Sequence, residues 1–488
     1  MLGPWQENLS LRKFDKKQTI SHMKIFDNGA ELRALRKISG LSQSKLAEIT
    51  SVVQARISAY ELGKNGLKEN ERATIQATID GLDERAIRDL KIKRYRSHER
   101  TGNALASRTR RTYSKTNGNS EYLMTLAQLE NRFLCENSNA SPKAVSLFAG
   151  CGGLCYGVKA AGFRIVGASE LHAGFREIYN RNFPKVPTLT NDVRKICEAE
   201  CARIIAREGH IDLMAGGPPC QGFSLTGKRD PEDPRNVLFY DYLRIANAIR
   251  PKVVLMENVR LLTSMKNPEG RLLTECILEA FSDIGYKAGF FCLNAKDYGV
   301  PQHRERVIFI AILEETGKAP ALPRATHGEG ATLFGIEKPY RAFGDAVSDL
   351  DYIESGEKSR TDKWHFAVSH PDHVIEWLVD VPQGASAHDN DAAEMRPPSG
   401  YNTTYKRQVW NEPGSTVATT FAMISGCRNV HPIATRSMTI REAMRLQSFP
   451  DGFLLCGKIG DIRTAIGNAV PPLLGYVIGT HIRQSYIL

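Results

Sequence analysis

The stretch KAVSLFAGCGGL, residues 143–154, joins an apolar run to a glycine-rich turn. The run Lys143–Leu147 predicts a short strand, and the glycines after it predict a sharp turn that opens a helix. Because glycine has no Cβ, such a turn lets a ligand approach the backbone and the N-terminus of the helix closely. Strand, glycine turn and helix in this order indicate the first unit of an α/β domain.

Apolar strands alternate with helices from Pro142 to the C-terminus, which favours a parallel α/β sheet. The alternation fails between about residues 317 and 435, where Gly, Pro, His and charged residues dominate. We therefore expect an α/β domain over residues 143–316 that is completed by residues 436–488. A smaller lobe is inserted over residues 317–435.

Two carboxylates follow predicted strands of this domain. Arg164–Ser169 is predicted as a second strand that ends at Glu170, about twenty residues past the glycine turn, where a carboxylate suits a ribose diol. Asp192 follows at the tip of a predicted third strand, placed to accept a hydrogen bond from an adenine amino group. The pattern fits a dinucleotide enzyme, an adenosyl cofactor or a structural turn. Because the turn lacks the G-x-G-x-x-G spacing, a cofactor with a sugar and adenine but no pyrophosphate fits better.

A rigid turn carries a cysteine. The apolar run 211–215 predicts a buried strand, and GGPPCQGFS, residues 216–224, follows it. Two glycines allow a sharp turn, and two prolines fix the backbone directly before Cys220. A thiol held this rigidly suits nucleophilic chemistry. A small buried cysteine in a tight turn is the alternative.

Charged residues stand beside later strands. The buried run 251–256 ends at Glu257, at the edge of a parallel sheet where ligands bind. Arg304 and Arg306 directly precede the predicted strand 307–312. A surface salt-bridge set explains each of these charges equally well when it is taken singly.

Length and composition limit the class of protein. The 488 residues are too many for one ordinary core, so two or three domains are expected. The sequence has no uninterrupted run of 18 apolar residues to span a membrane, and residues 1–16 lack the apolar run of a secretory signal. The ten cysteines form no Cys-x-x-Cys pair, so no metal is expected and free thiols in a cytoplasm are favoured.

The net charge of +11 is unevenly distributed. Residues 85–115 hold eleven Lys or Arg against two acids, a local charge of +9. Such a segment suits a polyanion such as nucleic acid, or a solvated linker. We interpret residues 83–142 as a basic linker with one short helix near 122–133.

Residues 26–82 have helical apolar spacing and few breakers. Helices are expected from Gly29, over 43–49 and over 55–61, the last two joined by a tight turn. The order LSQSKLAEIT…ARISAYELGK resembles the lambda-repressor/Cro-like helix-turn-helix family. The resemblance implies DNA contacts from four side chains: Gln43, Gln54, Arg56 and Ser58. A small helical bundle used for packing or dimerisation is the alternative.

Nine segments of the α/β region occur in one fixed order. They are SLFAGCGGL, GASE, NDV, GGPPCQGFS, DPRNVLF, ENV, QHRER, MTIREAMRLQSFPD and GNAVPP. Together they resemble the DNA cytosine-5 methyltransferase family, from about Pro142 to the C-terminus. The resemblance implies a Rossmann-like, S-adenosylmethionine-dependent methyltransferase sheet with a smaller target-recognition lobe. An all-α helix-turn-helix domain would precede it.

The same resemblance implies roles for individual residues. Cys220 would add to carbon 6 of cytosine, and Glu257 would bind ring nitrogen 3 and the amino group. Arg306 would bind the base carbonyl oxygen, while Arg304 would support the adduct and the loop. The implied cofactor residues are Phe148, Gly150, Gly152, Glu170, Leu171, Asp192, Pro219, Leu238 and Asn468. Leu171 departs from members with an aromatic residue at this place, so adenine packing there would be aliphatic.

The target base lies inside a duplex and must be flipped out, so double-stranded DNA is the expected partner. Ser224 belongs to a polar loop, residues 221–236, that is long enough to close over DNA. The lobe is expected to read bases, and Arg407, Arg428 and Asn429 are candidate base contacts. Its run 415–420, which includes Thr419, resembles the threonine-containing signature of the recognition domains of the family.

We expect the modification enzyme of a type II restriction–modification system in the bacterial cytosol, monomeric in catalysis. Its N-terminal domain would regulate transcription of its own operon, as a dimer on the operator. A transfer-RNA cytosine-5 methyltransferase and a non-catalytic DNA-binding regulator are the alternatives.

Overall fold

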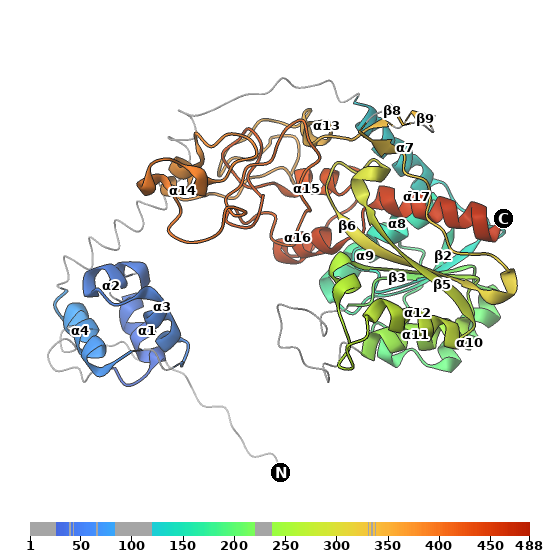
Figure 1. Ribbon diagram of the computed structural model, residues 1–488, viewed down its shortest axis with the longest axis horizontal. Coiled ribbons are helices and arrows are strands. Elements are labelled where there is room, and N and C mark those ends of the chain that lie inside the picture. Colours follow the sequence, from blue (N-terminus) through green and yellow to red (C-terminus); the bar gives the residue numbers. More distant parts are fainter. Residues whose placement is uncertain are drawn as a thin grey trace, which may run out of the picture. The chain divides into compact units, whose positions relative to one another are not determined.

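The chain is described here by a computed structural model (Figure 1). It describes residues 26–38, 41, 43–64, 67–82, 120–219, 237–329, 331–332, 335–336 and 338–488. Contacts divide the chain into a first unit within residues 1–101 and a second unit within residues 102–488.

The described part of the first unit contains four short helices with a common core. They are α1 (Gly29–Ile38), α2 (Gln43–Thr50), α3 (Gln54–Glu61) and α4 (Glu69–Asp80). The helices expected near 43–49 and 55–61 are therefore present, each extended by one residue. Their apolar faces meet in a core formed by Phe26, Leu32, Leu41, Leu46, Val52, Ile57, Ile75 and Ile79.

A buried ion pair joins three of these helices. Arg36 of α1 donates to both carboxylate oxygens of Glu61 of α3, at 2.6 and 2.9 Å. Gln43 of α2 donates to the same carboxylate at 2.8 Å. Burial alone would raise the pKa of Glu61, but the hydrogen bonds from Arg36 and Gln43 and the positive charge of Arg36 lower it. The carboxylate thus stays charged and holds α1, α2 and α3 at fixed angles.

The second unit is built on a six-stranded sheet in the order β2-β1-β3-β4-β6-β5. The strands are β1 (Lys143–Leu147), β2 (Arg164–Ser169), β3 (Leu213–Gly216), β4 (Val253–Val259), β5 (Tyr286–Asn294) and β6 (Glu305–Leu313). Strands β2, β1, β3 and β4 pair in parallel, as the sequence predicted. Strand β6 instead runs antiparallel between β4 and β5, so the sheet is mixed. The connection over residues 295–304 is too short for the crossover that a parallel β5–β6 pair would need.

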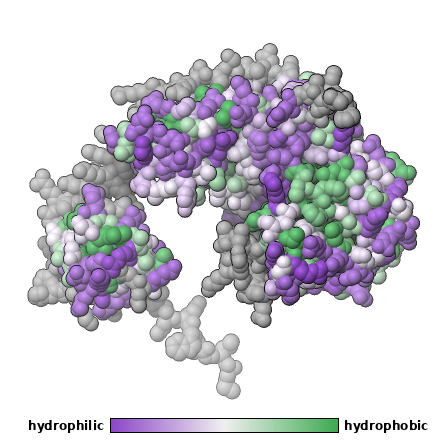
Figure 2. Space-filling model, in the orientation of Figure 1, coloured by the Kyte–Doolittle hydropathy of each residue, from purple (hydrophilic) through white to green (hydrophobic). Residues whose placement is uncertain are grey.

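Helices cover both faces of the sheet (Figure 1). One face packs against α10, α11 and α12, and the other against α8, α9 and α17. Their bounds are α8 (Gly153–Ala160), α9 (Ala173–Asn182), α10 (Glu198–Glu208), α11 (Val237–Ile249), α12 (Leu273–Asp283) and α17 (Pro472–Ile482). Figure 2 shows a hydrophobic patch over the edge strand β5, where Phe290 is exposed.

Helix α7 (Glu121–Leu134) corrects the expected extent of the linker. Its apolar side chains Tyr122, Leu126, Leu129 and Phe133 are buried in the main core of the second unit. The ring of Phe133 stacks on Tyr156 of α8 with centroids 3.8 Å apart. The short helix expected near 122–133 is therefore confirmed, and its buried apolar face makes it a part of the α/β unit rather than a piece of a linker.

Residues 317–435 contain little regular structure, in agreement with the loss of alternation in the sequence. The described elements are β7 (His327–Gly328), β8 (Ala331–Thr332), β9 (Gly335–Ile336), β10 (Lys338–Pro339), α13 (Phe343–Val347) and α14 (Asp372–Leu378), with two short 3-10 turns. A small core of its own includes Val374, Leu378 and Val430. Phe343 and Val417 instead belong to the core of the α/β domain. The lobe is thus joined to the sheet domain by shared packing.

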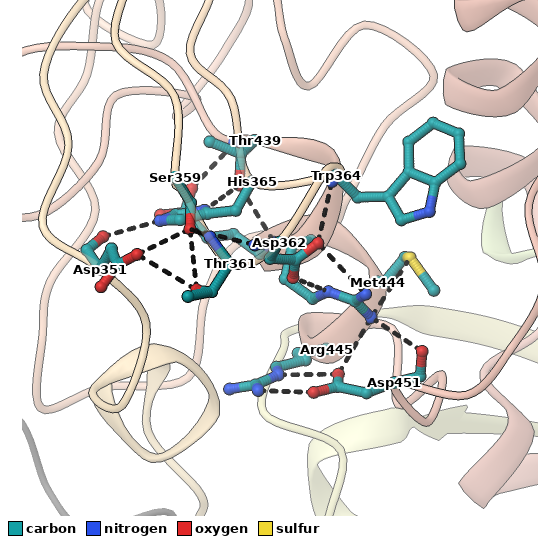
Figure 3. Close-up of polar contacts among 12 residues, drawn as sticks. Asp351, Ser359, Thr361, Asp362, Trp364, His365, Thr439, Met444, Arg445 and Asp451 are labelled. Atoms are coloured by element: carbon teal, nitrogen blue, oxygen red, sulfur yellow. Dashed lines mark hydrogen bonds and ion pairs between the residues drawn. The ribbon is translucent and has the colours of Figure 1, made fainter.

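Ion pairs also fix the lobe to α15 (Ile440–Leu446), as Figure 3 shows. Arg441 contacts Asp362 of the lobe at 2.5 Å and Asp451 at 3.0 Å. Arg445 contacts Asp451 at 2.7 Å. Burial would raise the pKa of Asp451, but the hydrogen bond and charge of Arg445 and those of Arg441 lower it. The negative charge therefore persists between the two arginines.

The buried pair in the first unit predicts the effect of Glu61→Ala. Removal of the carboxylate leaves the Arg36 guanidinium buried without its counter-charge, which costs about 3–5 kcal/mol of stability. We expect faster amide hydrogen exchange throughout α1, α2 and α3 in the full chain. Glu69→Ala, at the exposed start of α4, is the matched control. Equal exchange rates in the two variants would contradict the role of the pair.

Buried His370 predicts a pH dependence of stability. Its Nε2 accepts a hydrogen bond from the backbone N–H of Ser437 at 3.2 Å, and burial lowers the pKa of His370 to about 4. Because the neutral form is favoured in the fold, its contribution is complete above about pH 6.5 and is lost as the pH falls toward 4. At pH 5 the loss is about 2 kcal/mol. Urea unfolding at pH 7.5 and pH 5 should show a smaller pH effect for His370→Gln than for the unsubstituted chain. An unchanged pH effect would show that His370 does not titrate in this range.

Candidate active site

A cavity of about 980 Å³ opens at the carboxyl ends of the parallel strands. The segments that follow β1, β2, β3 and β4 line it, together with Arg306 of β6 and the end of α16 (Ile459–Asn468). Strands β2 and β3 pair on opposite sides of β1, so the cavity lies where the strand order reverses. This is the usual position of ligand sites in open α/β sheets.

The glycine turn after β1 forms one wall. Phe148, Gly150 and Gly152 have φ values of 54°, 58° and 98°, which lie in the left-handed region. A Cβ at Gly152 would lie 2.5 Å from the ring of Phe183, so no larger residue fits there. The backbone N–H of Gly150 donates to Glu170 at 2.8 Å. The turn therefore fixes the Glu170 carboxylate at the cavity wall.

Glu170 retains the capacity for a further ligand. Its second oxygen accepts from the backbone N–H of His172 at 2.7 Å. Each carboxylate oxygen has two lone pairs, so both oxygens can accept one more hydrogen bond from a diol.

Asp192 lies in the cavity wall, but no strand leads to it. The described residues show only an isolated bridge between Ala168 and Thr188, followed by a 3-10 helix at Val193–Lys195. The predicted third strand is therefore wrong, because too few residues pair there to form a ladder. Arg194 donates to both Asp192 oxygens at 2.7 and 2.9 Å, and these hydrogen bonds lower the pKa of Asp192. The carboxylate stays ionised and remains an acceptor.

Most of the expected cofactor residues line the same cavity. They are Phe148, Gly150, Glu170, Leu171, Asp192, Pro219, Leu238 and Asn468. Leu171 is 63% exposed and presents an aliphatic side chain at the cavity. Gly152 does not line the cavity; it caps α8 from behind the turn.

The opposite wall carries an ion pair. Arg306 Nε lies 2.8 Å from Glu257 Oε1, and both side chains are only 14% exposed. The antiparallel register sets Arg306 opposite Val259, so the pair forms across β4 and β6. Asn258 donates to the carbonyl of Pro218 at 2.9 Å and so ties the proline turn to the end of β4. Pro219 is the last residue described before the turn continues; Cys220 and Ser224 lie outside the described residues.

Arg304 does not face the cavity. Its side chain is fully buried and donates to the carbonyl oxygens of Val417, Gly467 and Ala469 at 3.2, 3.0 and 2.8 Å. Burial, and then the charge of Arg306, lower the pKa of Arg304. Arg304 therefore braces the lobe and the end of α16 and is not part of the cavity wall. Its expected support of the adduct and the loop stays a prediction.

Arg407 is also corrected, since it is 1% exposed and cannot reach DNA. Its guanidinium donates to the carbonyl oxygens of Leu378, Val381, His431, Ile433 and Ala434. It stabilises the inside of the lobe. Thr419 is half-buried and its backbone packs against Gly467, whereas Arg428 is half-buried and lines a separate cavity.

The four expected DNA contacts of the first unit differ in their surroundings. Gln54 is exposed and Ser58 is half-buried. Gln43 is bound to Glu61, and Arg56 forms an ion pair with Glu71 of α4 at 2.5 Å.

Two functional positions were missed from the sequence. Arg194 orients Asp192, and Gln302, fully buried, accepts from the Val417 N–H at 3.0 Å and donates to the Leu446 carbonyl at 2.8 Å. Both roles depend on which backbone groups come near. The one available signal was that Gln302 belongs to the segment QHRER and that Arg194 directly follows the segment NDV. Within the described ranges, no cluster of three His, Cys, Asp or Glu is arranged to hold a metal ion. In the same ranges, no helix is both long and apolar enough to cross a membrane.

Comparison with known proteins shows which family this chain resembles. The family model described as C-5 cytosine-specific DNA methylase matches residues 143–484. The type II methyltransferase M.DdeI of Desulfomicrobium norvegicum is 32% identical over 376 residues, covering 69% of this chain and 88% of that protein. M1.HphI of Haemophilus parahaemolyticus is 34% identical over 338 residues, covering 68% and 84%. In fold, the chain resembles a crystal structure from an E. coli prophage described as a DNA modification methyltransferase, with a TM-score of 0.56, 22% identity, and coverage of 71% and 99%.

Proposed function

The chain belongs to the C-5 cytosine-specific DNA methylase family and methylates cytosine in DNA. We propose that the target base is flipped out of the duplex and that Cys220 forms a covalent bond to it during methylation. One observation carries the proposal. A single cavity joins the Glu170 side, suited to an adenosyl group, to the Glu257–Arg306 pair, and Pro219 in its wall leads directly to Cys220.

The cavity residues fit S-adenosylmethionine as the methyl donor. Glu170 can accept from the ribose hydroxyls, and ionised Asp192 can accept from the adenine amino group. Phe148, Leu171 and Leu238 offer apolar contact. The volume of about 980 Å³ is at the upper end of the range of ligand pockets, enough for a cofactor beside a base. When bound, the cofactor supplies an electrophilic methyl group.

The side chains of the opposite wall suit the activation of cytosine. The Cys220 thiolate forms a bond to carbon 6, and the electron pair of the 5,6 double bond moves to make carbon 5 nucleophilic. Glu257 binds ring nitrogen 3 and the amino group, and Arg306 donates to the base carbonyl oxygen, so both stabilise charge that develops on the ring. After methylation a base removes the carbon-5 proton. The 5,6 double bond re-forms and Cys220 leaves as thiolate.

Arg306 has a second role before substrate binds. Its guanidinium holds Glu257 in a fixed orientation at 2.8 Å. Arg304 contributes indirectly, because it anchors the residues 467–469 that continue into the cavity wall.

Cys220→Ser should abolish methyl transfer and leave DNA binding intact, because serine keeps the size of the side chain but is a far weaker nucleophile at neutral pH. Transfer of labelled methyl to duplex DNA, with gel shifts in parallel, measures both. Cys197→Ser, at an exposed cysteine before α10, is the control. Full activity in Cys220→Ser would refute the covalent mechanism, and labelling of transfer RNA in place of DNA would refute the substrate.

The wider role that we propose is the modification enzyme of a type II restriction–modification system. Its support is the naming of the relatives M.DdeI and M1.HphI as type II methyltransferases. The proposed arrangement is a catalytic domain over 143–316 and 436–488 with a recognition lobe over 317–435. It acts as a monomer on duplex DNA in the bacterial cytosol.

For the first unit we propose a helix-turn-helix domain over residues 26–82 that binds an operator as a dimer. The support is the short α2–α3 pair with a tight turn, and the exposed Gln54 in the first turn of α3. The Arg36–Glu61 pair keeps α3 in a fixed orientation for such a contact.

Deletion of residues 1–85 should preserve methylation and remove binding to a fragment of the operon's own promoter. Contacts divide the chain into two compact units, so the second should keep its fold without residues 1–85. Gln54→Ala should weaken promoter binding in the full chain, with Glu69→Ala as control. Unchanged promoter shifts in the deletion variant would contradict the regulatory role.

A further inference from the structure

A second cavity, of about 670 Å³, lies beside the active-site cavity. Its lining comes from the residue after β4, the end of β5, the segment that leads into β6, the start of β6, and the lobe. The lining residues are Arg260, Asn294, His303, Glu305, Arg306, Ser415, Thr416 and Arg428. Arg306 lines both cavities. A ligand group in the second cavity is therefore one side chain away from a base held by Glu257 and Arg306.

The three arginines of the second cavity differ in their partners. Arg260 forms an ion pair with Glu305, and Arg306 pairs with Glu257. Within the described residues the guanidinium of Arg428 makes no hydrogen bond or ion pair. Its backbone is nevertheless fixed, because its carbonyl accepts from Gln408 Nε2 and from Ser415 Oγ. The lobe thus presents, from an anchored backbone, a guanidinium that has no partner among the described residues.

The remaining polar groups offer donors in excess of acceptors. Asn294 Oδ1 accepts from the backbone N–H of Arg304 at 3.0 Å, which leaves its amide nitrogen as a donor. Glu305, the one carboxylate in the lining, is already paired with Arg260. Burial, followed by the charges of Lys296 and Arg428, lowers the pKa of His303, as expected in a positive field.

We propose that the second cavity binds the DNA phosphodiester next to the target nucleotide, with Arg428 as the principal contact. A base edge presents both donors and acceptors, whereas a phosphodiester presents acceptors and a negative charge. The excess of donors and the unpaired guanidinium match the phosphodiester. The inference rests on the proposed function, since it places the target base in the first cavity. It replaces the expectation that Arg428 reads a base.

The test compares Arg428→Gln, Arg428→Lys and the control Arg203→Gln, which alters an exposed arginine on α10. Fluorescence anisotropy measures DNA binding with S-adenosylhomocysteine present, at several salt concentrations. Arg428→Gln should weaken binding about tenfold. The weakening should be equal for a duplex with the sequence that the enzyme methylates and for duplexes that differ from it at one base pair. The magnitude of the slope of log K against log salt concentration should fall by about 1. Arg428→Lys should keep the slope, and Arg203→Gln should change nothing.

A second arm uses duplexes in which one phosphate beside the target cytosine is replaced by a neutral methylphosphonate. One such position should weaken binding of the unsubstituted chain and have no further effect on Arg428→Gln. Changed sequence discrimination with an unchanged salt slope would overturn the proposal in favour of a base contact. If the unsubstituted chain methylates DNA while Arg428→Gln binds normally, only the phosphate site fails. If the unsubstituted chain does not methylate DNA, the proposed function itself fails.

Discussion

The buried guanidinium of Arg304 connects three parts of the second unit that lie far apart in the sequence. It lies directly before β6 and donates to carbonyl oxygens of the lobe and of the end of α16. Since a buried charge without polar partners is costly, all of these carbonyl groups must be in place together. Gln302 adds hydrogen bonds to Val417 and Leu446. The start of β6 therefore fixes both the lobe and the cavity wall.

The antiparallel placement of β6 in the mixed sheet decides which side chains meet at the cavity. Because β6 runs antiparallel beside β4, its first residues lie at the same edge as the carboxyl ends of the parallel strands. Arg306 thereby meets Glu257, although 48 positions separate them in the sequence. In a wholly parallel sheet the start of β6 would lie at the opposite edge. One reversed strand thus brings an arginine to the place where ligands bind, and the braced lobe adds Arg428 on the other side of it.

Much of the site was predictable because its residues lie directly after strands or in glycine and proline turns. Glu170 and Glu257 follow apolar runs, and local pattern is enough to place them at the ligand edge. Asp192 lines the cavity, but it precedes a 3-10 helix and does not end a strand. The polar residues before it form only one isolated bridge with a neighbouring strand. Arg304 and Arg407 could not be assigned, because a guanidinium suits DNA and buried carbonyl groups equally.

The sequence by itself determined the family, the parallel part of the sheet, the helices of the first unit and most of the residues that line the first cavity. These features depend on periodicity, turn residues and short ordered segments, all of which are local. Tertiary structure alone decided the reversal of β6, the inclusion of α7 in the core, and which arginines are buried braces. The reason is physical: burial, pairing and charge compensation depend on groups far apart in the chain, and no local pattern records which of them meet.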